Sequence, residues 1–245
     1  MFDNHNRRAG AVIVPVIFTY GKDGACAIEA AGALRDVGFD FVVVFEDMHH
    51  PVTDECRKAL CKLAYVCQSD HPNPGGQFGI ECLRGIVDCH LQVDSAYVLK
   101  VDSDTIVRRV GRIKQAAVDG VAAAAWTWHG WEFSGCCALI SRKTLLHAQK
   151  LLANPPAWIG ERCPEDITIG RIAEEVGEVR RFPYNAEGGF AAGYRYGKTT
   201  LEEYARRFDV VTFGNRHLLP GRDCDKREKV AFTMSRFRRI SLDGE

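Results

Sequence analysis

Apolar and polar positions change period several times along the first hundred residues of the chain. Three short apolar runs have the length and composition of buried strands: Ala11–Thr19, Phe39–Phe45 and Tyr97–Val101. Three stretches have the spacing of helices that bury one face: Ala25–Val37, Thr53–Val66 and Phe78–His90. Strands that alternate with helices in this way predict an α/β fold, with a mostly parallel central sheet and helices on both faces.

The second half of the chain is less regular. Strand-like runs occur at Val121–Trp128, Phe133–Ser141 and Val179–Phe182. Helical spacing occurs at Ile106–Val118, Lys143–Leu152 and Glu165–Val176 and, near the end of the chain, at Lys226–Arg239. Because no linker or internal repeat separates the two halves, we expect one α/β domain over residues 1–245.

Composition narrows the class of protein. Lys and Arg number 32, as do Asp and Glu, and this zero formal net charge argues against a polybasic nucleic-acid coat protein. Hydrophobic residues make up 46% and charged residues 26%, a balance typical of soluble globular chains. No apolar run approaches the roughly 20 residues of a membrane-spanning helix, and no secretion signal is recognised. The ten cysteines form no C-x-x-C pair, so we expect reduced thiols in a cytoplasmic enzyme.

Acidic residues follow two of the predicted strands. Glu46 and Asp47 come after the second apolar run, and Asp102 and Asp104 come after the third. In an open parallel sheet, ligands bind beyond the carboxyl ends of the strands. Two carboxylates separated by one residue offer the hard oxygen ligands that Mg²⁺ and Mn²⁺ prefer. The alternative is that Ser103 or Asp104 only caps a helix that begins near Thr105.

Three motifs then appear in order: YVLKVDSDTIV at Tyr97–Val107, SGCCALISR at Ser134–Arg142, and EDITIG at Glu165–Gly170. Together they resemble the β-1,3-galactosyltransferase-like families of GT-A-fold glycosyltransferases, whose central strand reads approximately Y-V-x-K-x-D-D-D-T-F-V. The resemblance spans about the middle third of the chain. It implies a single GT-A-like, Rossmann-like domain with a nucleotide-sugar-binding half at about 1–105, an acceptor-binding and catalytic half at about 106–215, and a basic segment at about 216–245.

The resemblance also implies an activity. A metal-dependent, inverting enzyme would move a sugar from a nucleotide-diphosphate sugar, such as a UDP-sugar, to an acceptor hydroxyl. Asp102 and Asp104, with His217 as a further ligand, would hold Mn²⁺ or Mg²⁺ against the donor phosphates. Other contacts with the donor are assigned to Glu46, Asp47, Arg84, Lys100, Asp102, Trp131, Gly135 and Arg216. A cation at this place stabilises the leaving group most as the glycosidic bond breaks.

The E-D dipeptide supplies the expected general base. By the same resemblance, Asp166 would take the proton of the acceptor hydroxyl, and Glu165 would orient Asp166 or contact the acceptor. Because both residues follow Pro164 in the first turn of a predicted helix, the alternative is that they only complement the helix dipole.

The basic C-terminal segment permits three interpretations. Arg216, Arg222, Lys226 and Arg227 could close over the diphosphate as a lid. They could equally belong to a solvated basic helix, because Val230, Phe232, Met234 and Phe237 make no clean helical stripe. The third interpretation is a surface for DNA or another polyanion.

Aromatic residues and histidines near the motifs are also open to two interpretations. Trp126 and Trp128 alternate along a predicted strand and suit the core, whereas Trp131 in a loop suits contact with a sugar. His49 and His50 line the donor pocket or are exposed to solvent.

The acceptor stays open at this stage: a glycan, lipid, protein, small molecule or hydroxylated DNA base. Two rival functions also remain. A sugar-phosphate nucleotidyltransferase would carry a glycine-rich basic loop after the first strand, of which Thr19–Gly24 is a poor version. A non-catalytic sugar- or nucleic-acid-binding protein would keep its binding function without Asp104 and Asp166.

Overall fold

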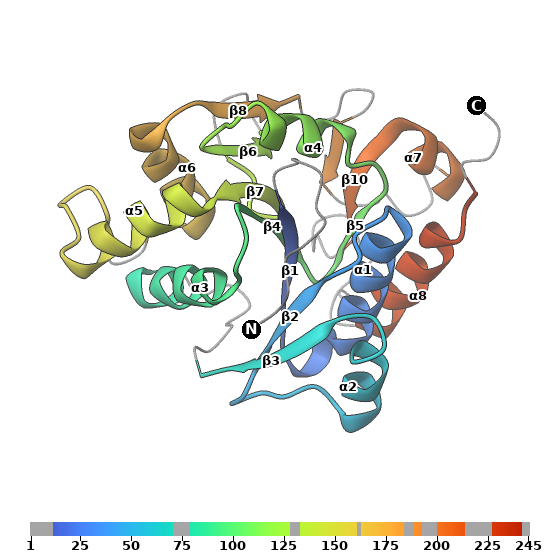
Figure 1. Ribbon diagram of the computed structural model, residues 1–245. Coiled ribbons are helices and arrows are strands. Elements are labelled where there is room, and N and C mark those ends of the chain that lie inside the picture. Colours follow the sequence, from blue (N-terminus) through green and yellow to red (C-terminus); the bar gives the residue numbers. More distant parts are fainter. Residues whose placement is uncertain are drawn as a thin grey trace, which may run out of the picture.

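The computed structural model describes residues 12–70, 79–127, 133–160, 163–183, 189–192, 200–213 and 227–241. Its central feature is a seven-stranded sheet in the order β3-β2-β1-β4-β7-β6-β8 (Figure 1). The strands of this sheet are β1 (Ile13–Thr19), β2 (Val43–Asp47), β3 (Tyr65–Ser69), β4 (Tyr97–Asp102), β6 (Ala123–Trp126), β7 (Cys137–Ser141) and β8 (Val179–Phe182).

The sheet is mostly parallel, as the sequence predicts. Strands β1 to β4 all run in the same direction, with Phe18 opposite Asp102 and Thr19 opposite Glu46. Strand β7 is antiparallel to both of its neighbours, and β8 is parallel to β6. The register therefore brings the ends of β1, β2 and β4 to one edge of the sheet, where both acidic clusters lie.

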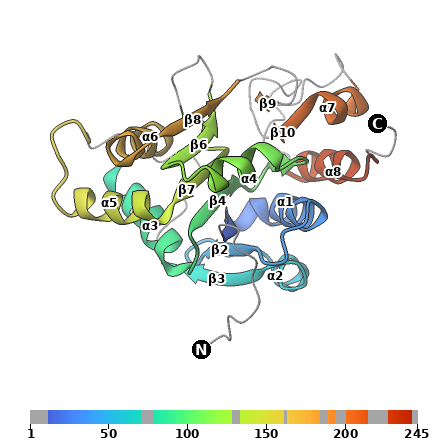
Figure 2. The same ribbon diagram turned by 45° about the horizontal axis from the view of Figure 1, so that its top comes forward.

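Helices cover both faces of the sheet (Figures 1 and 2). One face packs against α3 (Ile80–Gln92), α5 (Arg142–Ala153) and α6 (Glu165–Val176). The other packs against α1 (Gly24–Asp36), α2 (Asp54–Leu60), α4 (Gly111–Val118) and α8 (Arg227–Arg238). Alternate residues of β4 divide between these two cores, Val98 on the α3 face and Leu99 on the α1 face. Lys100 and Asp102 follow Val98 by two and four residues, so they lie on the same face of the sheet as Val98.

A second, three-stranded sheet begins immediately after the acidic turn that follows β4. Its order is β5 (Thr105–Val107), β10 (Phe208–Thr212) and β9 (Gly189–Ala192). Helix α7 (Leu201–Arg207) leads directly into β10, and a single 3₁₀ turn, η1 (Gly21–Asp23), follows β1. Strand β10 is antiparallel to β5 and parallel to β9. Strand β5 begins just after the D-x-D motif, and the antiparallel strand β10 ends beside that motif.

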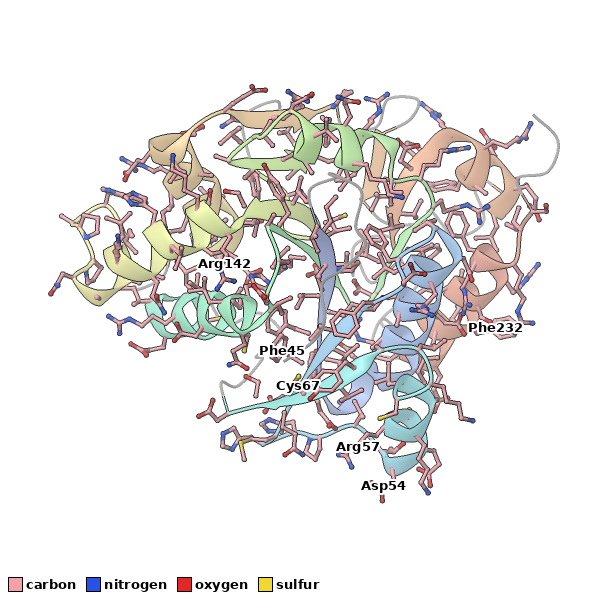
Figure 3. The ribbon with its side chains drawn as sticks, viewed as in Figure 1. Phe45, Asp54, Arg57, Cys67, Arg142 and Phe232 are labelled. Atoms are coloured by element: carbon pink, nitrogen blue, oxygen red, sulfur yellow. The ribbon has the colours of Figure 1, made fainter. Side chains whose placement is uncertain are left out.

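Helix α8 lies alongside α1 and is anchored there by an apolar stripe (Figure 1). Val230, Met234 and Phe237 are buried at spacings of four and three residues, which place them on one side of the helix. Phe232 is 66% exposed and lies on the outer side of the helix (Figure 3). The interpretation of a solvated helix without an apolar stripe is therefore wrong. Val230, Met234 and Phe237 form the stripe, and Phe232 lies on the opposite face of the helix.

Two predicted helices were drawn too long. The helix predicted at Thr53–Val66 ends at Leu60, and Tyr65–Ser69 forms edge strand β3, which pairs with β2. The helix predicted at Ile106–Val118 starts only at Gly111, because Thr105–Val107 pairs with β10. Ser103 and Asp104 consequently precede a strand, and the helix-capping alternative for them is wrong.

The cysteines and the lengths of the helices bear on two expectations drawn from the composition. All cysteines in the described ranges are free thiols: Cys26, Cys56, Cys61, Cys67, Cys82, Cys89, Cys136, Cys137 and Cys163. None of the helices described here is both long enough and apolar enough to cross a membrane.

Candidate active site at the end of β4

The D-x-D motif lies in a turn that is fixed by backbone hydrogen bonds on both sides. The backbone N–H of Asp102 donates to the carbonyl of Cys136 at 2.9 Å, just before β7. The backbone N–H of Phe213 donates to the carbonyl of Asp104 at 2.9 Å, just after β10. The turn therefore joins the large sheet to the small one, and its two carboxylates lie at the carboxyl edge of β4.

Asp102 belongs to a cluster centred on Lys100. The Lys100 Nζ lies 2.8 Å from Asp102 Oδ1, 2.8 Å from Glu165 Oε1 and 2.7 Å from the carbonyl oxygen of Gly135. Burial alone lowers the pKa of Lys100, but the two carboxylates outweigh this effect and hold the pKa well above its ordinary value. The side chain is therefore a buried ammonium ion that links the D-x-D motif to the E-D motif.

Asp166 lies beside this cluster, in the first turn of α6. Its Oδ2 accepts a hydrogen bond from the Gly135 N–H at 3.3 Å, and its Oδ1 accepts one from the Ile167 N–H at 2.8 Å. A Cβ atom added to Gly135 would lie 3.0 Å from the Asp166 Cβ, so the loop approaches α6 this closely because residue 135 is glycine.

A hollow opens between the strands and α6 at this point. Its apolar wall consists of Ile86, Phe133, Ala138, Ile140 and Ile169. Lys100, Gly135, Glu165 and Asp166 supply its polar part. The volume of the hollow is about 10 Å³, which is enough for roughly one water molecule.

Asp104 belongs to a second cluster, centred on Arg227 at the start of α8. The Arg227 Nη1 lies 3.0 Å from Asp104 Oδ2, and its Nε lies 3.0 Å from Asp23 Oδ1. Two hydroxyls complete the cluster: Ser103 Oγ donates to Asp23 Oδ2 at 3.0 Å, and Thr212 Oγ1 donates to Asp104 Oδ1 at 3.2 Å.

The carboxylates of this second cluster are strongly influenced by burial. Burial and then the charge of Asp102 raise the pKa of Asp104, although Arg227 acts in the opposite direction. Burial likewise raises the pKa of Asp23. Asp23 was not predicted as a site residue. Its position directly after β1, at the same sheet edge as the D-x-D motif, is the signal that could have found it.

The donor atoms at the end of β4 fit a divalent cation. Asp102 and Asp104 offer hard carboxylate oxygens, and both side chains are partly exposed. Across the two clusters, the four carboxylates of Asp23, Asp102, Asp104 and Glu165 face only two basic side chains, which leaves an excess of negative charge. Within the described ranges no three acidic, His or Cys side chains group as a complete ligand set.

The two acids at the end of β2 are held by neighbouring protein groups. Glu46 is fully buried, and it accepts hydrogen bonds from the Val52 N–H at 2.8 Å and from Arg57 Nε and Nη2, each at 2.9 Å. Arg57 reaches it from α2, where it also pairs with Asp54 (Figure 3). Glu46 thus orders the loop between β2 and α2, and its contact with a nucleotide stays a prediction.

Asp47 has a similar local role. Its Oδ1 accepts hydrogen bonds from the backbone N–H groups of His49 and His50, at 2.8 and 3.3 Å. Both histidine side chains are exposed, as one of the two interpretations expects. A contact between Asp47 and a base or ribose also stays a prediction.

The structure does not bring Arg84 to the D-x-D motif. Its guanidinium donates to the carbonyl of Leu152 and pairs with Glu81, which ties α3 to the end of α5. Trp126 is buried and packs on Phe182 with ring centroids 5.1 Å apart, which confirms its expected place in the core. Several predicted site residues lie outside the described ranges: Trp128, Trp131, Arg216, His217, Arg222 and Lys226.

Comparison with known proteins adds evidence on the fold. No protein-family model and no curated sequence matches the chain. Among solved structures, the galactosyltransferase LgtC in complex with donor and acceptor sugar analogues matches with a TM-score of 0.58 and 13% identity, over 94% of this chain and 98% of LgtC. The mannosyltransferase PcManGT from Pyrobaculum calidifontis, in complex with GDP-Man and Mn²⁺, matches with a TM-score of 0.50 and 11% identity, over 93% of this chain and 74% of PcManGT. At these identities the likeness concerns the fold: the chain has the α/β architecture of GT-A glycosyltransferases.

Proposed function

We propose that the protein is a metal-dependent glycosyltransferase that moves a sugar from a nucleotide-diphosphate sugar to an acceptor hydroxyl. The observation that carries the proposal is the meeting of Asp102, Lys100 and Glu165 at the carboxyl edge of a GT-A-like sheet, with Asp104 in the same turn. The solved complexes of LgtC with sugar analogues and of PcManGT with GDP-Man and Mn²⁺ support it, because those enzymes share this fold.

In this proposal Asp102 and Asp104 hold Mn²⁺ or Mg²⁺. Bound there, the cation supplies a Lewis acid that stabilises negative charge on the departing nucleotide diphosphate. The two aspartates leave the remaining coordination positions to water and phosphate oxygens, as Mg²⁺ and Mn²⁺ sites usually do. A UDP-sugar is the donor we test first.

Asp166 acts as the general base. Asp166 is one of the residues that line the hollow, and its carboxylate is oriented by the Gly135 N–H. As the acceptor oxygen attacks the anomeric carbon, its proton passes to Asp166, and the bond from that carbon to the diphosphate breaks on the opposite side. This sequence of events inverts the configuration at the anomeric carbon.

The test is to incubate the protein with a panel of UDP- and GDP-sugars and simple glycoside acceptors, with and without Mn²⁺, and to measure nucleotide release and glycoside formation. We expect turnover with at least one donor, and we expect it only with Mn²⁺. Replacing Asp166 by Asn should lower the rate of transfer by about 10²–10⁴-fold, the usual contribution of a general base.

A matched control lies on the same helix. Glu175→Gln changes an acid of α6 that pairs with His147 on the surface, so it should leave transfer unchanged. Turnover that persists after complete removal of metal ions would contradict the metal assignment. Transfer at the wild-type rate by Asp166→Asn would place the base elsewhere.

A further inference from the structure

We propose that Lys100 is a positioning residue, which fixes the separation between the D-x-D carboxylate that faces the donor and the E-D carboxylates that face the acceptor. The inference rests on the proposed function, and it adds a role for a side chain that we do not expect to touch either substrate.

The first argument is the number of partners. A Lys ammonium has three N–H donors. The Nζ of Lys100 has three oxygen atoms within 2.8 Å, one each from Asp102, Glu165 and Gly135. The side chain is only 10% exposed. All three donors are therefore used inside the protein, and in this proposal Lys100 does not make the contact with the nucleotide-sugar donor that the resemblance implied for it.

The second argument is where those oxygens come from. Asp102 ends β4, Gly135 lies in the loop before β7, and Glu165 opens α6. These segments are far apart in sequence and join only through the fold. Because β4 lies between β1 and β7 in the sheet, Lys100 extends from an interior strand that is paired on both sides.

The third argument is a link from Lys100 to the general base. The residue-135 carbonyl accepts from Lys100, while its N–H donates to Asp166 Oδ2. Lys100 therefore contacts Glu165 directly. It also binds the carbonyl of Gly135, whose N–H donates the hydrogen bond to Asp166. A shift of the ammonium would move both acids of the E-D motif.

The charge of Lys100 is as important as its position. Without it, Asp102 and Glu165 would face each other as two carboxylates with no cation between them, and they would separate. A displacement of about 1 Å between reacting groups can lower a rate by about 10²-fold. The Asp102 backbone stays bonded to the Cys136 carbonyl, so we expect Glu165 to be the acid that moves and donor affinity, which depends on Asp102 and Asp104, to be kept.

The experiment compares Lys100→Met with Lys100→Arg and with a control, Lys114→Met, which removes an exposed lysine of α4 that lies over Phe39. Steady-state kinetics give kcat for the active donor, and calorimetry gives the Kd of its free nucleotide diphosphate with Mn²⁺. We expect Lys100→Met to lower kcat by about 100-fold and to change that Kd by less than about threefold. Lys100→Arg keeps the positive charge but replaces the compact ammonium with a planar guanidinium. We expect it to lower kcat by about tenfold.

The outcomes separate this proposal from the proposed function. If wild-type protein and Lys114→Met turn over a donor and a folded Lys100 variant retains the wild-type kcat, the positioning role is overturned and the glycosyltransferase assignment stands. If kcat and Kd change together, or if neither Lys100 variant folds, Lys100 supports the structure and the positioning role is likewise overturned. If wild-type protein turns over no donor, the proposed function fails, and the inference fails with it.

Discussion

Two basic side chains lie at the carboxyl end of β4, and each is placed between two carboxylates. Lys100 lies between Asp102 and Glu165, and Arg227 lies between Asp104 and Asp23. Each cluster thus contains one aspartate of the D-x-D motif. The clusters also lie on different faces of the sheet. Lys100 is on the face of β4 that packs against α3 and α6. Arg227 comes from α8, which packs against α1 on the other face.

The informative difference is the exposure of the acids. The side chains of Asp102 and Glu165 are 38% and 30% exposed, whereas those of Asp23 and Asp104 are 5% and 17% exposed. A ligand can reach the first pair, and water can solvate it if the cation is lost. The second pair depends on Arg227 for most of its charge compensation. We therefore expect the Lys100 cluster to matter more for transfer and the Arg227 cluster more for stability.

The largest effect should follow from Arg227→Met. Removing this guanidinium leaves Asp23 and Asp104 as buried carboxylates without their counter-ion, and losing one partner of a buried ion pair usually costs about 3–5 kcal/mol. We expect the free energy of unfolding in urea to fall by this amount without metal. Mn²⁺ should restore part of it, because a cation at Asp104 replaces some of the lost charge.

The matched control is Arg236→Met, which removes an exposed arginine of the same helix. It should change stability by less than about 0.5 kcal/mol. Lys100→Met, with its better solvated acids, should lie between the two. If Lys100→Met destabilises the protein more than Arg227→Met does, the division of roles between the clusters is wrong.

A smaller effect, on transfer alone, should follow from Gly135→Ala. The new Cβ would lie 3.0 Å from the Asp166 Cβ and 3.5 Å from both Asp166 Oδ2 and Glu165 Oε1. The two contacts at 3.5 Å are ordinary, but Asp166 must move by a few tenths of an ångström, and we expect kcat to fall about tenfold. Steady-state kinetics and thermal unfolding check this expectation.

Gly111→Ala is the control for the glycine substitution, since a Cβ there meets no atom within 4 Å. It should leave kcat unchanged. If Gly135→Ala lowers the melting temperature but leaves kcat intact, the close approach of the loop to α6 serves packing and not the alignment of Asp166.

Much of the fold could be predicted because its signals are local. Helix α6 (Glu165–Val176) and strand β8 (Val179–Phe182) have the bounds that the sequence pattern predicts, since Pro164 opens the helix and Gly177 ends it. Strands β3 and β5 were missed because they are short and are defined by pairing with β2 and β10. Such pairing is tertiary and leaves little trace in the local pattern.

The same limit applies to the candidate site. The rule that ligands bind beyond strand ends selected Asp102 and Asp104, and the structure places them at the expected edge. It could not reveal that Arg227, near the end of the chain, pairs with Asp23 near its beginning. Nor could it show that Arg57 holds Glu46, because an ion pair between a strand and a helix depends on how the two pack.

The smallest effect at neutral pH concerns His90, a buried residue of α3. Its ring is 1% exposed, packs on Phe18 with centroids 5.4 Å apart, and finds no hydrogen-bond partner among the described residues for either nitrogen. Burial and then the charge of Lys100 lower the pKa of His90 from 6.5 to about 3. The unfolded chain therefore binds a proton below about pH 6.5 that the folded protein does not bind until about pH 3.

The free energy of unfolding should consequently decrease as the pH is lowered through this window. This histidine contributes up to about 1.4 kcal/mol per pH unit to the decrease. His90→Phe keeps the ring against Phe18 and has no proton to bind, so its unfolding free energy should depend less steeply on pH between about 6.5 and 3. Equal slopes for His90→Phe and wild type in urea unfolding would mean that burial does not lower the pKa of His90 in the folded protein.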